Sequence, residues 1–112
     1  MDKEKIMREN KKGKEEKMDQ RERARKKRRL RTLQKQMAEL GPVMRGSVVL
    51  IGTRNKQFYF SLNKEGKTKI IYLGKKRVEK AREYSDNHKQ LLAIIEEMTM
   101  LNMELLKEDP NL

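Results

Sequence analysis

The fold is decided by the stretch Gln57-Phe58-Tyr59-Phe60-Ser61-Leu62, in which large apolar residues alternate with polar or amphipathic ones. A period of two is typical of a β-strand with one buried face, because successive side chains of a strand point to opposite sides of the sheet. The alternation predicts a buried face made of the two phenylalanines and Leu62, and an exposed face made of Gln57, Tyr59 and Ser61.

Two further runs rich in β-branched and aromatic residues flank this strand, Ser47 to Ile51 and Thr68 to Leu73. The connections Gly52 to Lys56 and Asn63 to Gly66 contain Asn and Gly, which tolerate the positive φ angles of hairpin turns. The three runs therefore predict a three-stranded antiparallel β-meander.

The third run leaves its own orientation open. Ile70 and Tyr72 would share one face of the strand, and Ile71 and Leu73 would share the other. Both pairs are apolar enough for a core, so one residue of register decides between them.

Helices are expected on both sides of the meander. Residues 20–40 contain no Gly or Pro, and Leu30, Leu33, Met37 and Leu40 recur at intervals of three and four until Gly41-Pro42 ends the helix. A second, long amphipathic helix is expected from Lys75 or Arg77 to about Lys107. Its broad apolar surface comprises Val78, Ala81, Leu91, Leu92, Ile94, Ile95, Met98, Leu101 and Leu105.

The predicted fold class is α+β, with two layers around one small core. We expect residues 1–19 to be a disordered or frayed charged tail and residues 20–40 to form a basic helix. The meander and the long C-terminal helix occupy residues 43–108, and residues 109–112 form a short tail.

Charge is distributed unevenly along the chain of 112 residues, whose net charge is +12. Residues 1–39 carry +8, residues 43–82 carry +9, and residues 83–112 carry −5. Such a balance favours polyanionic partners, nucleic acid first, because bound cationic side chains release counterions from phosphates. No apolar stretch is long enough to cross a membrane, so we expect a soluble cytoplasmic protein, nucleoid-associated if the host is a prokaryote.

The segment from residue 21 to residue 31 has eight basic residues in eleven. A helix so charged repels itself unless an anion neutralises it, and Arg matches phosphate oxygens bidentately. A solvated face or a localisation signal would have the same composition. The predicted phosphate contacts are Arg21, Arg23, Arg25, Lys26, Lys27, Arg28, Arg29 and Arg31.

The predicted sheet also interleaves basic residues with aromatic ones. Its exposed face could read bases as a β-ribbon does or stack on single-stranded bases. Partly buried tyrosines with solubilising lysines at the sheet edges would give the same pattern. The predicted contacts are Arg45, Arg54, Lys56, Gln57, Tyr59, Ser61, Lys67 and Lys69.

Leu91, Ile95, Met98, Asn102 and Leu105 follow the intervals of a helical seam on the last helix. A lone Asn in such a seam can fix the register of a dimer, which predicts a homodimer or a protein partner there. The same residues could equally fill the core of the single chain.

No catalytic constellation is recognisable. The chain has no Cys and one His, His88. We therefore predict no metal site, no cofactor, no enzymatic activity and no small-molecule substrate.

The segment Leu40-Gly41-Pro42-Val43-Met44-Arg45-Gly46-Ser47, with Gly66-Lys67-Thr68 and Ile71-Tyr72 after the aromatic strand, resembles an uncharacterised family of small prokaryotic proteins often encoded near transposases. The resemblance covers about residues 31–107 and implies a mobile-element context. Members often have a cysteine-containing insertion between the first two strands, which this chain lacks. The stretch from Gln57 to Leu92 also resembles the N-terminal three-stranded DNA-binding domain of tyrosine recombinases, which implies DNA contact through the sheet.

Together these features predict a non-enzymatic nucleic-acid-binding protein, DNA before RNA, with phosphates bound by the basic helix and bases by the sheet. The alternative is an assembly subunit of a nucleoprotein complex that recruits a protein through its C-terminal helix.

Overall fold

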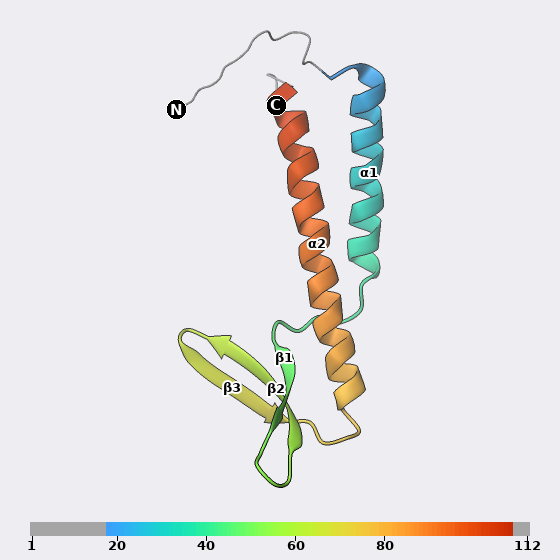
Figure 1. Cartoon of the computed structure of the whole chain (residues 1–112). Helices are drawn as coiled ribbons and strands as arrows, with labels where there is room; N and C mark the ends of the chain where they lie inside the picture. The colour runs from blue at the N-terminus through green and yellow to red at the C-terminus, as the bar shows by residue number, and fades with distance from the viewer. Residues whose placement is uncertain (1–17, 109–112) are drawn as a thin grey trace.

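The computed structural model describes residues 18–108. The order of elements is α1 (Gln20–Glu39), β1 (Ser47–Ile51), β2 (Gln57–Lys64), β3 (Lys67–Tyr72) and α2 (Val78–Glu108). The strands form one antiparallel sheet in the order β1-β2-β3, and α2 extends far beyond it to pack beside α1 (Figure 1). The predicted α+β class and the β-meander are confirmed.

The turn between β2 and β3 is tighter than expected. It contains only Glu65 and Gly66, which both have positive φ angles, 54° and 77°. Two central residues with positive φ match the right-handed twist of the flanking strands, so the ladder continues to the turn. Asn63 and Lys64, which we expected in the turn, therefore belong to β2.

The register of β3 resolves the ambiguity of the third strand. Phe60 lies opposite Ile71, so these two residues share a face, and Leu73 follows on that side as a residue only 4% exposed. Ile71 is nevertheless 55% exposed, because α2 contacts β1 and β2 but not β3. The core cluster beneath α2 consists of Phe60, Leu73, Val78 and Ala81.

The connection from α1 to β1 is fastened to α2 by three hydrogen bonds. The Asn87 side-chain amide donates to the carbonyl oxygen of Pro42 at 2.9 Å, and the Met44 amide donates to the carbonyl oxygen of Tyr84 at 3.1 Å. The Ser85 hydroxyl donates to the main-chain carbonyl oxygen of Gly46, just before β1, at 2.9 Å. These bonds fix where the sheet begins relative to the long helix.

α1 packs antiparallel to the C-terminal part of α2, on the opposite side of α2 from the sheet (Figure 1). Leu33, 1% exposed, is buried there with Ile94 and Leu105. Asp19 caps α1 by accepting a hydrogen bond from the Glu22 amide at 2.8 Å. The expectation of one small core is wrong, because α2 buries residues against the sheet at one end and against α1 at the other.

The described part is elongated as a result, with principal extents of 65 × 33 × 20 Å. Neither helix combines the length and apolar character needed to cross a bilayer. Residues 1–17 of the expected disordered or frayed charged tail, and residues 109–112 of the expected short C-terminal tail, lie outside the described residues.

Candidate nucleic-acid interface

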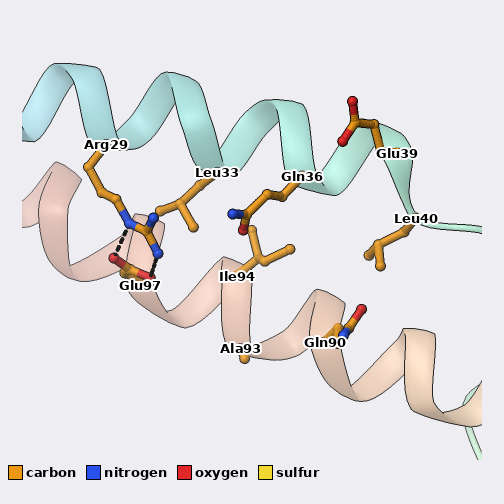
Figure 2. Close-up of a pocket in the computed structure, with 9 residues that line it drawn as sticks. All are labelled: Arg29, Leu33, Gln36, Glu39, Leu40, Gln90, Ala93, Ile94 and Glu97. Atoms are coloured by element: carbon orange, nitrogen blue, oxygen red, sulfur yellow. Dashed lines mark hydrogen bonds and ion pairs between the residues drawn. The ribbon is translucent and has the colours of Figure 1, made fainter.

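Residues 21–31 of α1, which we call the arm, contain the eight basic residues predicted to contact phosphates. Three of them are turned toward α2. The Arg29 guanidinium forms two hydrogen bonds with the Glu97 carboxylate, at 2.7 and 2.9 Å, as Figure 2 shows. Lys26 pairs with Glu104 at 3.0 Å. Arg23 donates to the main-chain carbonyl of Glu108 at 3.4 Å. Part of the positive charge of α1 is therefore neutralised within the chain.

The bidentate pair changes the titration of both partners. Its hydrogen bonds lower the pKa of the Glu97 carboxyl and raise the pKa of the Arg29 guanidinium. Each side chain is nearly half exposed, so solvent screens the interaction.

The other five basic residues of the run are exposed to solvent: Arg21, Arg25, Lys27, Arg28 and Arg31. None of them forms an ion pair with any residue between Met18 and Glu108. Lys35 extends this surface, which the sequence analysis missed although residues 21, 28 and 35 recur at the seven-residue spacing that returns a helix to one side. We call these six residues the outer face of α1.

An open cleft of about 500 Å³ lies between the two helices beside the Arg29–Glu97 pair (Figure 2). Leu33 and Ile94 form its floor, and Gln36, Glu39 and Gln90 line it with polar groups. Among residues 18–108 no three His, Asp or Glu side chains gather as metal ligands.

The solvent-facing side of the sheet carries the amphipathic residues that the alternation predicted. Tyr59 and Tyr72 lie opposite each other on β2 and β3, with ring centroids 5.5 Å apart in an edge-to-face arrangement. The Tyr72 hydroxyl donates to the Gln57 side-chain carbonyl at 3.1 Å. Ser61 is half-buried next to this group. Tyr72 is 49% exposed, so this face offers an aromatic edge to a ligand.

The basic residues of the sheet do not surround these tyrosines. Lys69 lies opposite Leu62, on the face of Phe60, and Lys67 lies opposite Lys64 on that same side. Arg45 donates to the main-chain carbonyl of Asn63 at 2.9 Å. Arg54 and Lys56 are exposed in the β1–β2 turn. The structure thus divides the predicted sheet contacts into an aromatic face and lysines on the other face.

The arm and the sheet occupy different levels of α2. The sheet is fastened at Ser85, and the arm is fastened at Glu97 and Glu104, which are 12 and 19 residues further along the helix. At a rise of 1.5 Å per residue these separations are about 18 and 28 Å. The two predicted contact surfaces do not form one continuous patch.

The predicted seam on α2 is also divided. Leu91, Met98 and Leu105 are at least half-buried and share the stripe of Ile94, which faces α1. Ile95 and Asn102 lie next to them on the helix but are exposed. Three of the five residues therefore face α1, and the other two lie at the exposed margin of this contact.

Comparison of the chain with known protein families, with curated proteins and with solved structures gave no significant match. The two resemblances given above stay predictions.

Proposed function

We propose that the protein binds the phosphate backbone of nucleic acid through the outer face of α1, without catalysing a reaction. The observation that carries this proposal is the exposed set Arg21, Arg25, Lys27, Arg28 and Arg31, which has no ion pair within residues 18–108.

Ion pairs and packing hold α1 against α2, and this order favours binding by the remaining cations. Arg29 and Lys26 are held by acidic residues of α2, and Leu33 anchors the helix below them. The remaining cations are thus presented on an ordered helix that does not need to fold when a ligand arrives. A preorganised surface binds with a smaller entropic cost than a disordered basic tail.

The cations of the outer face also lie close to one another. Five of them recur along α1 at intervals of three and four residues, at which like charges repel each other. Phosphate groups along the outer face relieve this repulsion, and each bound phosphate releases counterions. Duplex DNA is the ligand we propose, ahead of RNA, and the aromatic face of the sheet supplies any preference for sequence.

The test is a salt-titrated binding assay with duplex DNA, single-stranded DNA and duplex RNA. A variant in which Arg21, Arg25, Arg28 and Arg31 become Gln is expected to bind every nucleic acid more weakly, with a salt slope flatter by about 0.9 per lost contact on duplex DNA.

The matched control replaces four exposed lysines in the first part of α2 and just before it, Lys75, Lys76, Lys80 and Lys89, by Gln. It removes the same charge, so a general effect of net charge weakens both variants equally. Equal loss in the two variants, or no loss in the first, contradicts the proposal.

A further inference from the structure

α2 carries two apolar stripes, and only one of them is covered along its length. The first consists of Leu91, Ile94, Met98, Leu101 and Leu105 and faces α1. The second begins at the sheet, where Val78, Ala81 and Ser85 are buried. At alternating intervals of three and four it continues past His88 as Leu92, Ile95, Thr99, Asn102 and Leu106. We call these last five residues the second stripe.

The second stripe is open to solvent. Leu92 is 52% exposed, Ile95 46% and Leu106 59%, and the adjoining Met103 is 58% exposed. Leu92 and Ile95 are neighbours at one end of the stripe, and Met103 and Leu106 are neighbours at the other, with Thr99 and Asn102 between the two pairs. Apolar side chains gathered on one helix face in this way mark an interaction surface more often than scattered ones do.

The flanking segments of the sequence are poor in apolar residues. Residues 1–17 contain only Met1, Ile6 and Met7 beside twelve charged residues, and residues 109–112 contain only Leu112. Such compositions do not favour packing on an apolar stripe.

We propose that the second stripe pairs with the same stripe of a second copy of this chain, in an antiparallel orientation. Its spacing is that of the a and d positions of a coiled coil, a pattern that two identical helices satisfy together. Asn102 in the line gives the pair a preferred register, because a buried amide requires a polar partner.

The sheet dictates the orientation. In a parallel pair the partner helix would continue along Val78, Ala81 and Ser85, where the chain's own sheet already packs. An antiparallel pair overlaps only over residues 92–106, with its twofold axis beside Thr99 and the two sheets at opposite ends. About this axis each Glu96 lies level with Asn102 of the partner subunit, so the amide gains a polar partner and no second carboxylate lies opposite.

The dimer would have the basic arms at its centre. Arg29 lies at the level of Glu97 and Lys26 at the level of Glu104, so each arm runs beside the paired segment. Two outer faces then flank one twofold axis, although the pairing itself does not depend on nucleic acid.

Because the chain has no cysteine, single cysteines report the orientation directly. Under mild oxidation Thr99→Cys is expected to form a covalent dimer with itself. Leu92→Cys and Leu106→Cys are each expected to stay monomeric in denaturing gels when alone and to cross-link when mixed. Self-cross-linking of Leu92→Cys would indicate a parallel pair and overturn the proposal.

Sedimentation equilibrium gives the second readout. The native chain is expected at twice its monomer mass of 13.4 kDa. Ile95→Glu is expected to shift it to the monomer with its helical circular dichroism retained. Met100→Glu is the matched control, since Met100 is 51% exposed but lies off the second stripe. A native chain that is monomeric at all concentrations overturns the proposal. It does so even if a different protein is found to cover the second stripe.

Discussion

The Ser85 hydroxyl donates a hydrogen bond of 2.9 Å to the main-chain carbonyl of Gly46, and thereby ties the first part of α2 to the residue that precedes β1. Ser85 is only 6% exposed, so water does not replace this bond easily when it is removed. Ser85→Ala is expected to lower the free energy of unfolding by about 1–3 kcal/mol in urea denaturation. Ser47→Ala, at an exposed neighbouring position, is the control and is expected to change little.

Gly46 cannot be replaced by a residue with a side chain. Its φ is 139°, and an added Cβ would lie 2.5 Å from the Ser61 carbonyl oxygen and 2.7 Å from the Phe60 ring. Gly46→Ala is therefore expected to cost several kcal/mol and to lower the melting temperature sharply. Gly66→Ala is the control that shows backbone strain without a steric clash. Gly66 also has a positive φ, but no atom lies within 4 Å of the added Cβ. Its expected cost is about 1–2 kcal/mol, and equal losses in the two variants contradict the steric explanation.

The Arg29–Glu97 pair predicts a pH dependence of stability. The pKa of Glu97 is lowered in the folded chain, so the pair stabilises the fold fully above the ordinary carboxyl pKa of about 4.3 and loses this effect as the pH falls through the lowered value. The raised pKa of Arg29 adds no dependence in acid, since Arg stays charged there. Glu97→Gln is expected to lower the melting temperature at neutral pH and to match the native chain in strong acid. A difference that persists in strong acid contradicts this assignment, and Glu96→Gln is the control.

Neighbouring arginines of the arm are expected to contribute unequally to phosphate binding. Arg28 is exposed with no ion pair in the described part of the chain, whereas Arg29 is held by Glu97. Arg28→Gln should flatten the salt slope on duplex DNA by about 0.9, and Arg29→Gln by less. Glu97→Gln releases Arg29 and should steepen the slope. Equal effects of the two arginine variants would show that the ion pair opens on binding.

The two faces of β2 predict opposite outcomes for adjacent aromatic residues. Phe60 is 6% exposed in the core, so Phe60→Ala is expected to cost about 3–5 kcal/mol. Tyr59→Ala loses an edge contact with Tyr72, for about 0.5–1.5 kcal/mol, and should remain folded. If Tyr59 stacks on a base, its variant also loses about 1–3 kcal/mol of discrimination between preferred and random sequence. Unchanged discrimination in a folded Tyr59→Ala variant removes the sheet from base recognition.

The local elements could be predicted from the sequence because their signals are local. The strand Ser47–Ile51 has the expected bounds, and the helix before Gly41-Pro42 ends where the breaker requires. The orientation of β3 depended on its pairing with Phe60, which no pattern within the third run encodes.

The candidate site was predicted less completely, for a physical reason. The count of basic residues in the arm was visible, but which of them face inward depends on Glu97 and Glu104, which lie 68 and 78 residues further along the chain than their partners. The two apolar stripes of α2 likewise appear in the sequence as one broad surface. Only the packing of α1 and of the sheet against α2 divides that surface.

The arrangement of α1 and the sheet on opposite sides of α2 has a consequence for local opening. The two parts have no contact with each other between residues 18 and 108, so either can detach from α2 while the other stays packed. Amide hydrogen exchange should then show two separate protection levels, one for α1 and one for β1 and β2. Weaker packing at Leu33 is expected to speed amide exchange in α1 alone. The aromatic face of the sheet should keep its structure while the α1 amides exchange.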